Sequence, residues 1–307
     1  MMCRDRHGDD REGGFILVAA LWILISLAGL AGVLSVYLVN TAQGLSLEDD
    51  RLRSAALVSA SLELTAYQLS SSAKSLRAPA GSFSFRLDHA RVSVAFRSEA
   101  ARIDLNRASK EMLASLFEVL GARADDAGAY AERIVGWRTP AADTAPDVER
   151  DLYRTAGADH MPRTAPFENV EELRLVLNLP PALVDRAMPF VTVFSGRREI
   201  DPLEAAPEVV ASLPGMTQDL LKSFLAQRPG LRREIRSMTS LGPARAGATL
   251  EVADAVRVWI TISFDAGRRA AAEAVILLGD GDDPYRILSW RDDVVGPGTL
   301  KQSGKAL

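Results

Sequence analysis

FILVAALWILISLAGLAGVLSVYLVNTAQGLSL, residues 15–47, contains no charged side chain, and its first part, residues 15–39, is almost wholly apolar. An α-helix rises about 1.5 Å per residue, so roughly 20 apolar residues cross a hydrocarbon core about 30 Å thick. The stretch therefore predicts a membrane-spanning helix. The polar segment before it carries three arginines, which favour a cytoplasmic N-terminus. No small-residue cleavage site follows the apolar run, which argues against a conventional secretory signal.

The composition of the chain is that of a globular protein. The 307 residues are 25% charged and carry a formal net charge of −4. About 260 residues remain outside the membrane span, enough for one large or two ordinary domains. The net charge provides no basic footprint for nucleic acid. The only cysteine, Cys3, precedes the apolar run, so the remainder of the chain has no disulfide.

After the membrane span, the pattern predicts a long amphipathic helix followed by a hairpin. Apolar residues recur at helical intervals and form a stripe: Leu52, Ala55, Ala56, Leu62, Ala66, Leu69 and Leu76. Residues 77–81, which include Pro79 and Gly81, are expected to end this helix. Two runs then alternate apolar and polar residues, Phe83, Phe85, Leu87 and Val92, Val94, Phe96. They predict a hairpin whose apolar face covers the helix stripe.

A helical block then interrupts the sheet pattern for about 140 residues. Within it, residues 200–213 align without gaps on residues 103–116, with seven identities in fourteen positions. The two copies predict similar helical units packed together. Alternation returns over residues 256–264, 274–278 and 285–290. The sequence therefore predicts an α+β domain whose sheet is divided by an α-helical insertion.

The start of the chain resembles the class III signal of type IV pilins and pseudopilins, because a charged leader ends in Gly14 and Phe15 opens the apolar helix. The resemblance implies cleavage by a prepilin peptidase between Gly14 and Phe15 and N-methylation of Phe15. The family usually carries Glu at the fifth mature position, which here is Ala19. That departure is characteristic of the K-type minor pseudopilin of the type II secretion system.

The sequences of residues 103–109 and 285–291 resemble those of the same family, and so does the helical insertion in a pilin-like fold. The domains expected on this basis are a leader over 1–14, an N-terminal helix over 15–78 with its membrane span at about 15–39, a first part of the sheet over 79–104, an α-helical insert over 105–246, a second part of the sheet over 247–291 and a flexible tail over 292–307.

The resemblance implies a structural role at the tip of the periplasmic type II secretion pseudopilus, in initiation of assembly and in protein export across the outer membrane. The implied location is the inner membrane, with a single span, a cytoplasmic N-terminus and a periplasmic C-terminal domain. Implied partners are the I- and J-type minor pseudopilins, the pseudopilus shaft, prepilin peptidase, the inner membrane and secreted proteins. No nucleic acid is expected.

A second hypothesis is a membrane-anchored helix-hairpin-helix module of the DNA-uptake type. Residues 213–217, LPGMT, lie between two helical patterns and resemble the hairpin of such modules, which present backbone N–H groups to phosphate. Only one of the usual glycines is present, Gly215, and Asp219 follows where a phosphate-facing turn would avoid acid. The sequence favours an ordinary structural hairpin.

An acidic turn is the strongest candidate metal site in the sequence, and Asp125 and Asp126 are weaker candidates for ligands. Asp280, Asp282 and Asp283 offer the oxygen ligands that calcium prefers, but Asp and Gly are also the usual residues of a solvated turn. No cofactor is expected to be required. The sequence contains no nucleophile elbow, phosphate loop or zinc-protease motif, so we predict that the protein is not an enzyme.

Overall fold

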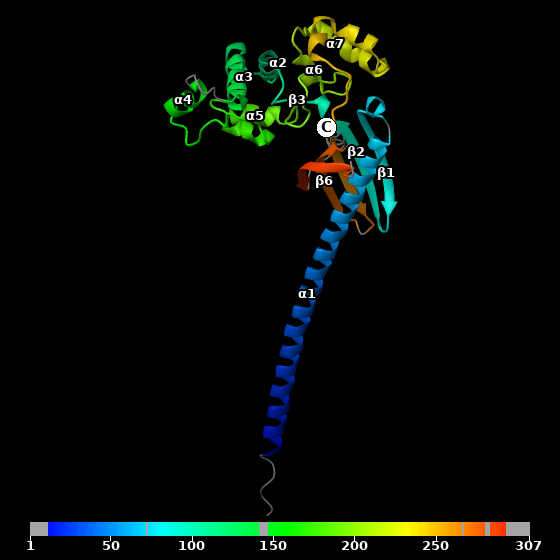
Figure 1. Cartoon of the computed structure of the whole chain (residues 1–307). Coiled ribbons are helices and arrows are strands. Elements are labelled where there is room, and N and C mark those ends of the chain that lie inside the picture. Colours follow the sequence, from blue (N-terminus) through cyan, green and yellow to red (C-terminus); the bar gives the residue numbers. More distant parts are fainter. Residues whose placement is uncertain (1–11, 72, 141–146, 266, 280–282, 293–307) are drawn as a thin grey trace, which may run out of the picture. The chain divides into compact units, whose positions relative to one another are not determined.

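The computed structural model describes residues 12–71, 73–140, 147–265, 267–279 and 283–292, without the side chains of 12–16, 38–50, 75, 235 and 236 (Figure 1). The chain divides into two units, Met1–Ala56 and Leu57–Leu307, each described by itself. The first contains most of helix α1, which extends over Glu12–Ser70. Within α1, Leu17–Tyr37 has a mean hydropathy of 2.5 and is long and apolar enough to cross a membrane. This segment lies inside the predicted span.

The second unit is built on a five-stranded antiparallel sheet with the order β1-β2-β5-β6-β7. Its strands are β1 Ala80–Leu87, β2 Ala90–Ser98, β5 Ala255–Phe264, β6 Arg269–Leu278 and β7 Tyr285–Asp292. All three predicted alternating regions after the insert are strands. Strand β2, before the insert, pairs directly with β5, after it, with Val94 opposite Ile260. The two halves of the predicted sheet are therefore a single sheet.

The end of α1 packs against one face of this sheet, as the apolar stripe predicts. Its buried side chains are Leu57, Val58, Leu62, Ala66 and Leu69, and they meet Val92, Val94, Phe96, Val258, Ile260, Ile262, Ala274 and Ile276. Burying one such large aliphatic side chain contributes about 1.5–3 kcal/mol. The stripe was wrong at both ends, because Leu52 is 64% exposed and Leu76 is 77% exposed. Ala55 and Ala56 are exposed as well, and the buried side chains nearest to them are Leu57 and Val58.

Helix α1 ends at Ser70, earlier than the predicted stop near residue 78. The hydroxyls of Ser70 and Ser71 donate to the carbonyl oxygens of Ala66 and Tyr67, one turn earlier. Such bonds let serine compete with the regular helix ladder. A separate 3-10 turn, η1 (Lys74–Leu76), then carries Leu76 out of the stripe, which explains its exposure.

The insert lies between β2 and β5 and has its own core, formed by residues from Ile103 to Ala244. A short 3-10 turn, η2 (Glu99–Ala101), leads into it. Its elements are β3 Ile103–Asp104, α2 Lys110–Val119, α3 Ala124–Arg138, α4 Val148–Thr155, η3 Val170–Leu175, α5 Pro181–Ala187, β4 Val191–Thr192, α6 Pro207–Ala211, α7 Gln218–Gln227, η4 Arg228–Gly230 and η5 Ile235–Gly247.

Helix α4 was not predicted, since its sequence is largely charged. Asp147 is its N-cap and accepts a hydrogen bond from the Arg150 backbone N–H, and Tyr153 alone anchors it in the core. An aspartate before a first turn that contains Glu149 and Asp151 is a usual start of a helix, so the capping pattern was the available signal.

The two copies of the repeat begin in the same way. In the first, Ile103 of β3 pairs in parallel with Val191 of β4 and donates its N–H to the Phe190 carbonyl. In the second, Ile200 forms a parallel bridge with Ala248 and donates its N–H to the Gly247 carbonyl. Each copy therefore starts with one parallel backbone pairing that closes its helical unit.

The helix–sheet contact predicts that two leucines of α1 contribute very differently to the stability of the second unit. Leu62 is completely buried, whereas Leu64, two residues later, is 44% exposed. We expect Leu62→Ala to lower the free energy of unfolding of the second unit by about 2–5 kcal/mol, because it leaves a cavity, and Leu64→Ala to change it by less than about 1 kcal/mol. Urea unfolding of the full chain in detergent, followed by tryptophan fluorescence, measures both. Equal losses in the two variants would contradict this packing.

Candidate functional sites

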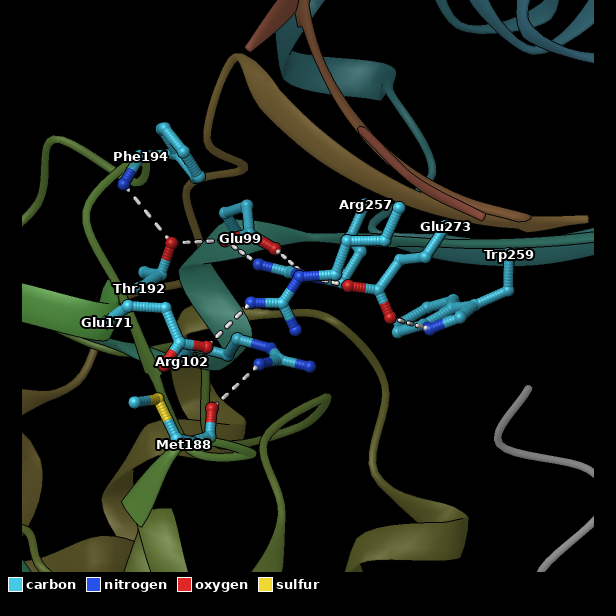
Figure 2. Close-up of polar contacts among 10 residues, drawn as sticks. Glu99, Arg102, Glu171, Met188, Thr192, Phe194, Arg257, Trp259 and Glu273 are labelled. Carbon is cyan, nitrogen blue, oxygen red and sulfur yellow. Dashed lines mark hydrogen bonds and ion pairs between the residues drawn. The ribbon is translucent and has the colours of Figure 1, made fainter. Parts of the chain in front are cut away.

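A buried ionic cluster lies where the insert joins the sheet, and Figure 2 shows its side chains. Glu99, in η2, is 1% exposed. Arg257, which projects from β5, binds it with two hydrogen bonds, from Nε to Oε1 at 2.7 Å and from Nη2 to Oε2 at 3.0 Å. Arg257 Nη1 also donates to Glu273 of β6, whose other oxygen accepts from Trp259 Nε1 at 2.8 Å. Both carboxylates are therefore held by fixed donors.

The insert contributes the other side of this cluster. The hydroxyl of Thr192, in β4, donates to Glu99 Oε2 and accepts from the Phe194 backbone N–H at 3.1 Å (Figure 2). The half-buried side chain of Arg102 lies beside these groups and reaches the Met188 carbonyl. Nearer the surface, Arg291 of β7 forms an ion pair with Glu171 of η3 at 3.2 Å. The cluster thus links β5, β6 and β7 of the sheet to η2, β4 and η3, which belong to the insert or lead into it.

Electrostatics keep the buried charges ionised. Burial alone would raise the pKa of Glu99, but the charges of Arg257 and Arg102 and the hydrogen bonds from Arg257 and Thr192 hold that pKa below its ordinary value. Burial, together with the like charge of Arg257, lowers the pKa of Arg102 to about 10. Glu99, Glu273, Arg102 and Arg257 therefore make a neutral set of two negative and two positive charges near pH 7.

The two ends of the insert are also tied to each other. Ser98, the last residue of β2, accepts hydrogen bonds at its Oγ from the backbone N–H groups of Ala253 at 3.0 Å and Ala100 at 3.3 Å. The Asp201 backbone N–H, at the start of the second repeat, donates to the Ala100 carbonyl at 2.7 Å. The chain therefore leaves the sheet and returns to it at one place, beside Glu99.

Corresponding aspartates begin the two repeats. Asp104 and Asp201 each accept a hydrogen bond from the backbone N–H two residues later, on Asn106 at 2.8 Å and Leu203 at 3.1 Å. Asp104 also accepts from Gly196, and Asp201 lies 2.7 Å from Arg233 Nη1. Burial raises the pKa of both carboxyls, and these partners only partly offset it. The role of both aspartates is to close a turn.

An arginine stabilises each of these turns. Arg138, at the end of α3, donates to the carbonyl oxygens of Leu105 and Ala108. Arg228, after α7, donates to the carbonyl oxygens of Pro202 and Ala205. These acceptors occupy corresponding positions of the repeat, but the arginines lie at different distances along the chain. The ungapped alignment therefore did not reveal that they are equivalent.

The N-terminal positions singled out in the sequence lie on α1. Gly14 and Phe15 have helical backbone, and Ala19 is half-buried. In the apolar part of α1, a Cβ added at Gly29 or Gly32 would meet no described atom within 4 Å. The fold of the chain itself therefore does not require glycine at these two places. Small residues in an apolar helix are typical of close helix–helix contact.

The hairpin at residues 213–217 connects α6 and α7. Gly215 adopts φ +80°, and its position lies against Pro243 and Ala244 of η5. The Met216 backbone N–H donates to the Leu213 carbonyl. One of the N–H groups that a phosphate-binding hairpin would present is therefore used internally, and η5 packs against the turn. These contacts favour the structural interpretation of the hairpin.

The acidic turn gives no geometry for a metal site. Asp280 and Asp282 lie outside the described residues, and Asp283 is exposed. Among the residues that the structure describes, no group of three or more His, Cys, Asp or Glu side chains is placed to hold a metal ion. Backbone bonding from the Gly279 N–H to the Pro284 carbonyl closes the turn between β6 and β7. Calcium binding there stays a prediction.

No pattern in the sequence indicates that Glu99 and Arg257 form a buried ion pair. The alternation over residues 256–264 puts Arg257 on the polar side of its strand, but alternation carries no information about its partner, which lies 158 residues earlier. Glu99 directly follows strand β2 and lies close before the repeat, which begins at Ile103. A charged residue at such a boundary was the only signal that the sequence offered.

The ionic cluster predicts a pH-dependent loss of stability in Glu99→Gln. Arg257 would lose its bidentate partner while still buried, so we expect the free energy of unfolding at pH 7 to fall by about 3 kcal/mol. In the native chain, this contribution is present above the ordinary glutamate pKa of 4.5 and is lost as the pH falls through the lowered pKa of Glu99. As the pH falls from 7 to 3, the free energy of unfolding should therefore decrease less in the variant than in the native chain.

Glu171→Gln is the matched control for this prediction, because its ion pair with Arg291 is solvent-exposed. Exposed ion pairs contribute at most about 1 kcal/mol to the free energy of unfolding. Urea unfolding of both variants between pH 3 and pH 7 makes the comparison. A Glu99→Gln variant as stable as the native chain at pH 7 would show that the buried pair does not hold the junction.

Comparison with known proteins gives one family and one fold. The family model for protein K of the type II secretion system (T2SS) matches residues 94–196, which include Glu99 and the first repeat. No curated protein matches the chain. A chain in the crystal structure of the GspK–GspI–GspJ complex from the enterotoxigenic Escherichia coli type 2 secretion system has the same fold, with a TM-score of 0.58. The two sequences are 14% identical, and the match covers 81% of this chain and 98% of that one.

The family model covers the start of the insert and the first repeat, and the structural match extends over most of the chain. The N-terminal apolar helix, the divided sheet and the helical insert all agree with the resemblance found in the sequence. Residues 94–196 therefore match the protein K family of the type II secretion system, and the fold of the chain is that of a chain in a solved complex from such a system.

Proposed function

We propose that this chain is a minor pseudopilin that caps the tip of a periplasmic pseudopilus, where it contributes to initiation of assembly and to protein export. The observation that carries the proposal is the large helical insert, which a buried ionic cluster and tied chain ends fix to the pilin-like sheet. A bulky body held rigidly on a subunit would block the addition of a further subunit above it. A tip position is compatible with such a block, and a position in the shaft is not.

The partners proposed for this chain are the I- and J-type minor pseudopilins and, through them, the pseudopilus shaft. The support is the likeness in fold to a chain from a solved GspK–GspI–GspJ complex. The apolar part of α1 supplies a second support, because Ala28, Gly29, Ala31 and Gly32 lie exposed on it. Small residues let two helices approach closely, so this face would pack against the helices of neighbouring subunits.

The absence of a carboxylate at Ala19 supports the tip position on electrostatic grounds. In pilin-like fibres, the fifth mature residue is a Glu that neutralises the free N-terminal amine of a neighbouring subunit. A tip subunit lacks one of these neighbours, and an unpaired carboxylate in an apolar helix bundle costs several kcal/mol. An alanine at this position avoids that cost.

The proposed location is the inner membrane, with one span, a cytoplasmic N-terminus and the folded unit in the periplasm. The apolar segment Leu17–Tyr37 supports a single-pass anchor by its length and composition. Prepilin peptidase is the proposed processing partner, acting between Gly14 and Phe15, and secreted proteins are proposed contacts of the assembled tip.

The charge argument predicts the effect of placing a carboxylate at position 19. We expect Ala19→Glu to reduce protein secretion and tip assembly by about tenfold or more, and Ala19→Gln, which has nearly the same size without the charge, to keep most of both. Secretion assays in a strain that lacks the native copy, with copurification of the I- and J-type subunits, measure the two variants. If Ala19→Glu secretes and assembles normally, the electrostatic explanation for this position fails.

The processing proposal predicts the chemical identity of the mature N-terminus. Mass spectrometry of the protein purified from membranes should find a chain that begins at N-methylated Phe15. In a strain without prepilin peptidase, the same analysis should find the leader still attached. A leader retained in both strains would make the apolar helix an ordinary anchor.

A further inference from the structure

The sheet has a second face, opposite to the one that α1 covers, and it is strongly basic. Because side chains alternate along strands, the residues between the buried ones share this outer face. One row across the sheet is formed by Arg86 of β1, Arg91 of β2, Ser263 of β5 and Arg269 of β6, each paired in register with the next. Three of its four positions are therefore arginine.

The rest of the outer face continues the pattern. Arg97 of β2 is paired in register with Arg257 of β5, and Glu273 of β6 with Arg291 of β7. In all, the face carries seven arginines and one glutamate: Arg86, Arg91, Arg97, Arg257, Arg269, Arg286, Arg291 and Glu273. The formal net charge of the whole chain is −4, so this concentration of positive charge is local.

Only part of this charge is neutralised within the fold. Arg257 and Arg291 bind Glu99 and Glu171, and Arg86 forms an ion pair with Asp265 at 2.6 Å. The remaining four are exposed and form no ion pair or hydrogen bond with the residues that the structure describes: Arg91, Arg97, Arg269 and Arg286.

Arg91 lies directly opposite Arg86, and like charges at such positions destabilise a sheet. The fold gains nothing from this arrangement, which suits an external anionic partner.

The shape of the basic face indicates the kind of partner. Between its charged rows lie short side chains and one half-buried aromatic: Ser93, Ala95, Thr261, Ala271 and Trp259. Arginine and tryptophan around a flat centre are typical of protein interfaces. Arg91 and Arg97 are about 20 Å apart along β2, and the row from Arg86 to Arg269 spans about 14 Å across the strands. This is a broad patch, whereas a nucleic-acid backbone needs a continuous basic track.

We propose that the outer face of the sheet binds an acidic surface on a neighbouring minor pseudopilin, an inference that rests on the proposed function. The uncompensated arginines attract the acidic surface, and Trp259, fixed by its bond to Glu273, lies in the contact. Electrostatic contacts of this kind set the orientation of two subunits and speed their encounter. The insert flanks this face at Arg257 and Arg291, so a subunit bound there would also meet the insert.

Charge reversal on this face tests the proposal. The double variant Arg91→Glu with Arg269→Glu changes the two exposed arginines of the first row, and the carboxylate introduced at position 91 would then face Arg86 as a favourable pair. The matched control is Arg123→Glu with Arg232→Glu, two exposed arginines of the insert with the same total change in charge. Thermal unfolding should show that both variants are as stable as the native chain.

Binding of the full-length variants to the purified I- and J-type subunits is then measured in detergent at about 50 and 300 mM NaCl. We expect the sheet variant to bind at least about tenfold more weakly at low salt and to lose most of its salt dependence, while the insert control binds like the native chain. Equal binding by both variants would overturn the role of the sheet face and leave the proposed function intact. A native chain that binds neither subunit would instead contradict the proposed function.

Duplex DNA and vesicles of anionic phospholipid serve as competing probes in the same assay. Tight binding of either probe that is lost only in the sheet variant, with pseudopilin binding unchanged, would overturn the proposal in favour of a different anionic ligand. Weak binding of both probes, unaffected by the two charge reversals, is the result that the proposal expects.

Discussion

The bidentate pair of Glu99 and Arg257 is the interaction on which the rest of the second unit depends. Both side chains are almost completely buried, and either charge left alone in that position would be costly. Glu99 lies at the start of the insert and Arg257 in the middle of the sheet. Because each buried charge is stable only beside the other, the ion pair fixes the insert against the sheet and joins their two hydrophobic cores.

Because this junction is fixed, each side can serve a different role. The face of the sheet toward α1 is a conventional core, and the insert closes its own core through two repeats with matching aspartates and arginines. The outer face of the sheet contacts the insert at Arg257 and Arg291 and keeps four exposed arginines beside it.

The sequence predicted those features that depend on local periodicity. Alternation located the strands, and the apolar stripe identified Leu62, Ala66 and Leu69 as core residues. It failed at Leu52 and Leu76, because periodicity continues past the place where a helix leaves its sheet. Helix α4 is largely charged and was recognisable only by its cap. The pairing of Glu99 with Arg257 joins residues 158 positions apart, and no local pattern encodes such a contact.

The direct pairing of β2 with β5 has a consequence for the order of folding. About 150 residues separate the two strands, and the entropy lost in closing a flexible loop grows with its length. A folded insert holds its own ends together, at Ser98 and Ala253, and so replaces that long loop by a short one. Pairing of β2 with β5 therefore costs less entropy once the insert has folded, so we expect the insert to fold before the central pair of the sheet forms.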